Sequence, residues 1–178
     1  MKQTVKFILI IIAGYLLSGC AITHSYGPYM GMVVDKDSEE PIEGAVVFVQ
    51  YFTEGMGGTS MFEGADEVLT GKEGEFLIPV NRIGTFRPLS GWDYPMFIIF
   101  KPGYGAYPGH RQSSISHYKE GHFPDKESVT IKLPRLKTRE ERKKNLRNIP
   151  NINAPEEKYK KLKELEKFET DLVFTQQK

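Results

Sequence analysis

The sequence of 178 residues has little of several features that mark common protein classes. A single cysteine excludes an internal disulfide framework and a cysteine-rich zinc module. A formal net charge of +1 argues against a general nucleic-acid binder. The apolar run at residues 7–17 is shorter than the about 20 residues that a bilayer-spanning helix needs. What remains is an apolar content of 39%, enough for one compact domain with additional segments.

The first twenty residues have the pattern of a secretory signal. Lys2 and Lys6 precede the apolar run, and small residues follow it. The ending Leu17-Ser18-Gly19-Cys20 resembles the lipobox of bacterial lipoproteins. The resemblance implies that residues 1–19 are a signal peptide cleaved before Cys20, which then carries lipid on its sulfur and its amino group. The alternatives are an ordinary signal peptide with a chance cysteine, or a short anchor helix.

Lipid on Cys20 would hold the rest of the chain at a membrane surface, because more than one acyl chain gives durable attachment. Ala21 stands where an aspartate would resemble an inner-membrane retention signal. In a Gram-negative bacterium this favours the periplasmic face of the outer membrane. Residues 20–28 are then expected to be a short tether.

The balanced net charge hides a division along the chain. Residues 21–134 have nine bases and fifteen acids, and residues 135–178 have thirteen bases and eight acids. The first region is therefore acidic and the second basic, which bears on partners and solubility rather than on fold.

Residues 29–134 contain short apolar and β-branched runs separated by turn residues. Strands are predicted at 29–36, 45–52, 68–70, 75–80, 95–100 and 128–133, with 68–80 as a hairpin. The region has no pattern for a long helix, so the chain is predicted to be mainly β, an antiparallel β-sandwich. Residues 53–66, 81–94 and 103–127 are expected to be long loops.

Four short motifs in this region resemble those of a known family. They are Gly31-Met32-Val33-Val34-Asp35 with Glu40-Pro41-Ile42-Glu43-Gly44-Ala45-Val46-Val47, then Thr70-Gly71-Lys72-Glu73-Gly74-Glu75-Phe76, Lys101-Pro102-Gly103-Tyr104, and Val129 to Leu133. Together they are similar to a carboxypeptidase regulatory-like (transthyretin-like) domain over residues 29–134. The resemblance implies a prealbumin-like sandwich and a non-catalytic accessory role.

Motifs for enzymatic chemistry are missing from the sequence. Transthyretin-like hydroxyisourate hydrolases end in Tyr-Arg-Gly-Ser, whereas this chain ends in Thr175-Gln176-Gln177-Lys178. There is neither a Gly-x-Ser-x-Gly nucleophile elbow nor a phosphate-binding Gly-Lys-Ser/Thr loop. We therefore expect no catalytic residues and no cofactor.

The segment 103–127 offers the alternative of a metal site. It contains His110, His117, Glu120 and His122, and imidazole and carboxylate are ligands that zinc accepts. His117-Tyr118-Lys119-Glu120 also matches the His-x-x-Glu of zinc carboxypeptidases. This alternative predicts a small metal-binding protein or metal-dependent hydrolase. The other interpretation is a solvated polar loop packed onto the sheet by its aromatic residues.

Three aromatic residues are candidates for ligand contact: Trp92, Tyr104 and Tyr107. Aromatic side chains on sandwich loops can stack on sugar rings or anchor a protein partner. The competing interpretation of Trp92 is a half-buried indole that caps one end of the core.

Residues 135–178 are predicted to form a charged helical extension. Thr138 and Glu141 have the spacing of a capping box, Pro150 and Pro155 mark a break, and a second helix is expected from Glu156. Its apolar stripe would either dock on the sandwich or contact a partner; the stripe comprises Leu162, Leu165, Phe168, Leu172 and Val173.

The sequence as a whole predicts a membrane-anchored, non-catalytic envelope lipoprotein that serves as a binding or structural module. Its expected partners are the membrane, through the lipid on Cys20, and an envelope protein or polysaccharide, with no nucleic acid. A metal-dependent role and a carbohydrate-binding role are the alternatives.

Overall fold

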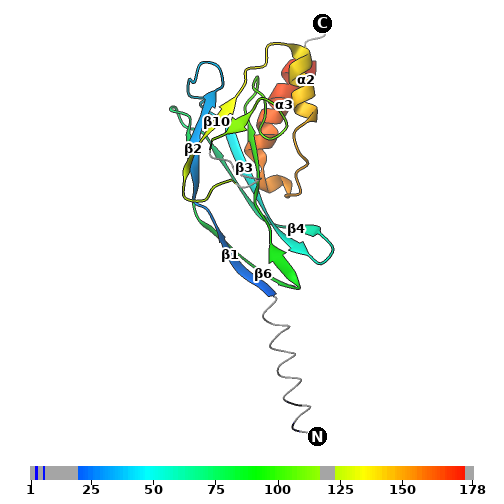
Figure 1. Ribbon diagram of the computed structural model, residues 1–178. Coiled ribbons are helices and arrows are strands. Elements are labelled where there is room, and N and C mark those ends of the chain that lie inside the picture. The colour runs from blue at the N-terminus through cyan, green and yellow to red at the C-terminus, as the bar shows by residue number, and fades with distance from the viewer. Residues whose placement is uncertain (1–2, 4–5, 7–19, 117–122, 175–178) are drawn as a thin grey trace.

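The computed structural model describes residues 3, 6, 20–116 and 123–174 of the chain. The chain is mainly β, as the sequence predicts, and ends in two helices (Figure 1). In chain order the elements are β1 (Cys20–Tyr26), β2 (Tyr29–Asp35), β3 (Val46–Gly55), β4 (Thr59–Leu69), β5 (Glu75–Ile78), β6 (Asn81–Pro88), β7 (Ser90–Trp92), β8 (Met96–Phe100), β9 (Ser114–Ile115), β10 (Ser128–Leu133), α2 (Arg139–Arg147), the 3-10 turn η1 (Glu156–Lys158) and α3 (Lys160–Phe174).

The described strands form three sheets. One has the order β5-β2-β10-β9, the second has β4-β3-β7 with β8 also paired to β3, and the third is the two-stranded arm β1-β6. Each described pairing is antiparallel except that of β2 with β10, which run parallel. This pair departs from the antiparallel sandwich that the sequence predicts.

The main core lies between the two larger sheets. Alternate residues of each strand point into it, such as Val33 of β2, Val47 of β3, Ile99 of β8 and Ile131 of β10, all of them fully buried. In β10, the alternation of buried and partly exposed residues matches the alternation of apolar and polar residues in the sequence.

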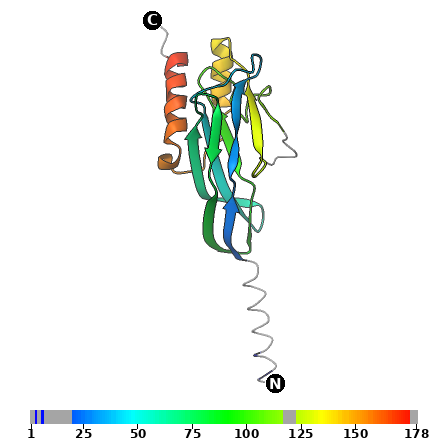
Figure 2. The same cartoon turned by 90° about the vertical axis from the view of Figure 1, so that its left-hand side faces the viewer.

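A third layer covers the outer face of the second sheet. Val46 and Phe48 of β3 point away from the main core and pack with Ala154 and Leu162, and α3 lies along this face in Figure 2. Both faces of β3 are therefore covered, which explains why Val46 to Val49 are apolar at four consecutive positions. Leu162 and Leu165 of the predicted apolar stripe dock on the sandwich, which is the first of the two predicted alternatives, whereas Phe168 of the same stripe is exposed.

The start of α2 is the capping box that the sequence predicts. The Thr138 side chain accepts a hydrogen bond from the Glu141 amide, and the Glu141 carboxylate accepts one from the Thr138 amide. An ion pair between Arg142 of α2 and the buried Glu169 of α3 then joins the two helices. The two helices of the polar extension are in this way held to each other.

Several predicted loops are strands. Residues 20–28, expected as a tether, instead contain β1, and it pairs with β6 from the segment 81–94. The segment 53–66 is the end of a long hairpin between β3 and β4. The strands β4 and β6 lack strong apolar runs because most of their residues are only partly buried or exposed, and the arm of β1 and β6 extends away from the rest of the sandwich (Figure 1).

The predicted hairpin at 68–80 is also wrong. Its two strands, β4 and β5, belong to different sheets, and β5 pairs with β2 instead. The turn between them therefore crosses from one sheet to the other. Gly74 suits this crossing, because its φ is +72° and a Cβ there would lie 2.4 Å from the Val33 carbonyl oxygen.

Candidate functional site

Two adjoining clefts form a groove at the β7–β8 edge of the sandwich. The larger is about 490 Å³ and the smaller about 250 Å³, and both are lined by Tyr94, Pro95 and Phe123. We call this feature the aromatic groove; the side chains that define it are His24, Trp92, Asp93, Tyr94, Tyr107, Phe123 and Asp125.

Backbone pairing fixes the wall of the groove. Trp92 is the last residue of β7 and pairs with Thr53 of β3. The next amide, of Asp93, donates to the Phe52 carbonyl at 3.0 Å. The buried Tyr26 hydroxyl donates to the Asp93 carbonyl at 3.0 Å. These hydrogen bonds therefore fix the position from which the chain continues after Trp92 into the groove.

The floor of the groove is a packed aromatic cluster. The rings of Phe97 and Phe123 stack with centroids 3.9 Å apart. Tyr29 meets both rings edge-on, at 4.9 Å and 5.8 Å. All three residues are buried, so this floor keeps its shape without a ligand.

Trp92 is both a wall of the groove and part of the core. It stacks with His24, with centroids 5.6 Å apart, and meets Tyr26 edge-on at 6.0 Å. Its Nε1 atom is buried, and no acceptor for it is found among the described residues. A buried unsatisfied donor costs about 1–3 kcal/mol. Packing, rather than hydrogen bonding, therefore holds the indole in place.

The polar groups of the groove are carboxylates, which accept hydrogen bonds, and protonated phenols. Asp93 and Asp125 place carboxylates along it. Burial, followed by the nearby Asp125 carboxylate, raises the pKa of Tyr29 far above its ordinary value. Burial, followed by Asp93, likewise raises the pKa of Tyr26. Both phenols therefore stay protonated at neutral pH.

The groove has the composition of a binding surface. Among the described residues that line it there is no serine, threonine or cysteine to act as a nucleophile. It offers flat aromatic faces beside carboxylate acceptors, a combination that can bind a ligand with apolar faces and several hydroxyl or amine donors.

The structure brings together two of the three predicted contact residues. Trp92 and Tyr107 line the two adjoining clefts. Tyr104 lies elsewhere: the guanidinium of Arg135 is 5.2 Å from its ring centroid, and its carbonyl accepts from Asn145 of α2 at 3.1 Å. Tyr104 thus helps to attach the helical layer.

Sequence reasoning missed Tyr94 and Phe123 as members of the groove. Each is followed directly by a proline, and such aromatic-proline pairs lie in the segments before β8 and before β10. That signal was visible in the sequence. What it could not reveal is that the two segments, far apart along the chain, line the same clefts.

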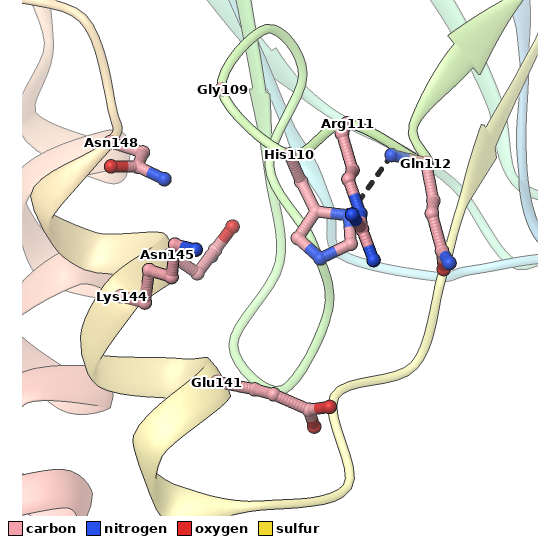
Figure 3. A pocket seen from close by; sticks show the side chains of 8 residues that line it. All are labelled: Gly109, His110, Arg111, Gln112, Glu141, Lys144, Asn145 and Asn148. Carbon is pink, nitrogen blue, oxygen red and sulfur yellow. Dashed lines mark hydrogen bonds between the residues drawn. The ribbon is translucent and has the colours of Figure 1, made fainter.

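A second, polar cleft of about 320 Å³ lies between residues 109–112 and α2 (Figure 3). His110 lines it, and its Nδ1 accepts from the Gln112 amide at 3.3 Å. Burial, followed by the charge of Arg111, lowers the pKa of His110. The imidazole is therefore biased toward its neutral form.

Two further polar groups of this second cleft, on Glu141 and Asn145, stabilise the fold. The Glu141 carboxylate accepts from the amides of Lys137 and Thr138 in the capping box. The side-chain oxygen Oδ1 of Asn145 accepts a hydrogen bond from the Ala106 backbone N–H at 2.8 Å, which attaches the loop to α2. This cleft is a place where the loop docks on the helix.

The predicted metal ligands are only partly described. His110 is in the second cleft, whereas His117, Glu120 and His122 lie outside the described residues. Within residues 20–116 and 123–174, no group of three or more histidine, cysteine, aspartate or glutamate side chains is placed to hold a metal. A metal site that uses the segment 117–122 stays a prediction.

The predicted lipidation residue, Cys20, is the first residue of β1 and pairs with Pro88 of β6. In the part of the chain that the structure describes, no helix is long and apolar enough to cross a membrane.

Comparison with known proteins found no matching family model, no matching curated protein and no matching solved structure.

Proposed function

We propose that the chain is a non-catalytic, membrane-anchored envelope lipoprotein whose aromatic groove binds carbohydrate chains. The observation that carries the binding role is the groove itself: two adjoining clefts that share Tyr94, Pro95 and Phe123 and have an aromatic floor. Ligand sites are typically preformed concave surfaces with a few well-placed polar groups.

The groove suits a sugar better than a purely apolar ligand. Trp92 and Tyr94 supply ring surfaces for the apolar face of a pyranose. Asp93 and Asp125 supply acceptors for its hydroxyl groups. Because the two clefts adjoin, the groove has room for more than one sugar unit, as an envelope polysaccharide would require.

The anchor is supported by the basic head, the apolar run at residues 7–17 and the Leu-Ser-Gly-Cys ending at Cys20. The arm of β1 and β6 lies at the end of the molecule opposite the C-terminal end of α3 (Figure 1), and Cys20 is the first residue of this arm. Lipid on Cys20 would hold this end at the bilayer and leave the body of the sandwich off the membrane.

We further propose that the sandwich is transthyretin-like. Two facing sheets and the positive φ of Gly74 in the predicted motif support it. A non-catalytic accessory role follows from this likeness and agrees with the composition of the groove.

Binding is tested by co-sedimentation of the purified protein with peptidoglycan sacculi and by a glycan array. Loss of a central aromatic contact typically costs about 2 kcal/mol, so Tyr94→Ala should weaken binding roughly thirty-fold. Phe168→Ala is the matched control, because Phe168 is an exposed aromatic residue on α3. Absence of binding to every glycan, or equal binding by both variants, would contradict the carbohydrate role.

The anchor is tested by intact-mass analysis of the full chain expressed in a bacterium. A lipoprotein should lose residues 1–19 and gain the mass of its acyl chains at Cys20. A Cys20→Ser variant should keep neither modification. An unmodified cysteine in the wild-type protein would refute the anchor without contradicting carbohydrate binding by the groove.

A further inference from the structure

The structure points to a second membrane contact: we propose that an apolar tip beside Cys20 inserts into the lipid bilayer. We call this surface the tip patch and define it by Met56, Phe86 and Leu89. This inference rests on the proposed anchor, because the anchor supplies the bilayer to which the tip is held.

The tip patch is built where two turns of the chain meet. Leu89 follows β6, and the Gly55-to-Thr59 turn joins β3 to β4. Gly55 pairs with both Thr59 and Ser90, which brings the two turns together.

The patch exposes large apolar side chains to an unusual degree. Met56 is 78%, Phe86 70% and Leu89 55% exposed, and the first two are the most exposed large apolar side chains in the described part of the chain. All three line one open cleft of about 520 Å³, so they form one surface. Contiguous apolar surface of this kind marks a contact with a protein or a membrane.

The backbone at Leu89 strengthens this interpretation. Its φ is +63°, a left-handed conformation that is favourable for glycine or asparagine and strained for leucine. Strained backbone conformations cluster at functional sites. The backbone conformation of Leu89 therefore has a free-energy cost, and because its side chain is exposed, packing in the core does not offset that cost.

The position of Cys20 identifies the occupant. Cys20 pairs directly with Pro88, which lies between Phe86 and Leu89 along the chain. Paired residues in an antiparallel ladder are about 5 Å apart. The apolar run at residues 7–17 leads into this same point. Whatever holds Cys20 at a bilayer consequently holds the tip patch at its surface.

The charges near the patch favour insertion over electrostatic attachment. Arg87 is the one charged residue among those that line the cleft, and it forms an ion pair with Glu63. The surface is thus apolar and nearly neutral. Binding should be similar for phosphatidylcholine and phosphatidylglycerol vesicles and only weakly dependent on salt.

The test uses the full chain reconstituted into phosphatidylcholine vesicles. Phe86→Cys provides a thiol for an environment-sensitive fluorophore, and Phe168→Cys on α3, 55% exposed, is the matched control. An acylated Cys20 takes no label, so the introduced thiol is the reactive one. We expect a lipid-borne quencher to reduce fluorescence at position 86 at least about twofold more than at position 168.

The wild-type chain separates failure of the anchor from failure of the insertion. If it takes no label and floats with the vesicles, but positions 86 and 168 are quenched equally, the tip inference is overturned and the anchor stands. A wild-type chain that does take label at Cys20 refutes the lipid anchor, and the tip is then judged by flotation alone.

In that case a Phe86→Ser/Leu89→Ser variant should float about tenfold less than wild type, because burial of two large apolar side chains is lost. Equal flotation of the two, or no flotation of either, would overturn the inference. A thermal melt checks the fold of each variant, and little loss is expected because these side chains are exposed. A change in the emission of the fluorophore at position 86 that depends on protein concentration, in the absence of lipid, would indicate a second copy of the chain and reject the bilayer.

Discussion

Replacing Arg142 with alanine should destabilise the protein, because it removes the ion pair that joins α2 to α3. The Nε atom of Arg142 donates to Glu169 Oε1 at 2.7 Å, and Nη2 donates to Oε2, so the pair is bidentate. The Glu169 side chain is 0% exposed, whereas that of Arg142 is 26% exposed. The substitution therefore leaves a buried carboxylate without its cation, while water can enter the space that the arginine leaves.

Breaking a buried ion pair by removing one partner costs about 3–5 kcal/mol, and partial access of water lowers this to about 2–3 kcal/mol. For a domain of this size, that corresponds to a loss of about 4–12 °C in Tm. The assay is a circular-dichroism melt of the purified chain at pH 7. Lys163→Ala is the control, because it removes a pair with Glu156 in which both side chains are exposed, and it should leave Tm nearly unchanged.

A paired replacement gives the reasoning a second test. Arg142→Met with Glu169→Leu removes both charges and fills similar volume, and should recover most of the stability that Arg142→Ala loses. If Arg142→Ala and Lys163→Ala have the same Tm, or if the paired variant is less stable than Arg142→Ala, the unpaired Glu169 carboxylate is not the source of the loss.

Two further predictions concern the sandwich. Gly74→Ala should lower Tm far more than Gly103→Ala. Both glycines have positive φ, but only at Gly74 would an added Cβ meet a backbone atom, the Val33 carbonyl oxygen. Equal losses of Tm in the two variants would contradict the steric account. Asp35 should make the protein acid-sensitive. Burial acts to raise the pKa of Asp35, but backbone amides and Arg135 outweigh it and hold the pKa below its ordinary 3.8. Its stabilising effect is then complete above about pH 4–5 and lost as pH falls through the folded-state value. The Tm difference between wild type and Asp35→Asn should shrink between pH 6 and pH 3, and a constant difference would disprove this contribution.

Local patterns in the sequence predicted much of the secondary structure correctly. The alternation in Ser128–Leu133 is that of β10, and Thr138 with Glu141 forms the capping box of α2. Such features depend on neighbours within a few residues, so they are visible in the chain itself.

The errors arose where a partner far along the chain decides the structure. Residues 20–26 have no strong strand pattern and become β1 because β6 pairs with them. Residues 68–80 have every sign of a hairpin, yet β5 leaves β4 and pairs with β2. The preference of a residue for a strand depends on the neighbours against which it packs, so the sequence pattern of one strand alone cannot identify its partner.

The candidate site divides in the same way. Trp92 and Tyr107 could be selected from the sequence as aromatic residues outside the predicted core. The groove that they line also needs Phe123, whose ring completes the floor by stacking on Phe97. Membership in a cleft depends on which segments the sheets bring together, and no residue type encodes that.

The sequence by itself determined the class of fold, the capped helix near the C-terminus and the expectation of a membrane address at Cys20, because each rests on contiguous residues. Only the tertiary structure decided that α3 covers the outer face of β3, that two clefts merge into the aromatic groove, and that Phe86 and Leu89 lie beside Cys20. These are contacts between residues distant in sequence, and it is the packing of the sheets and the register of their strands that brings such residues together.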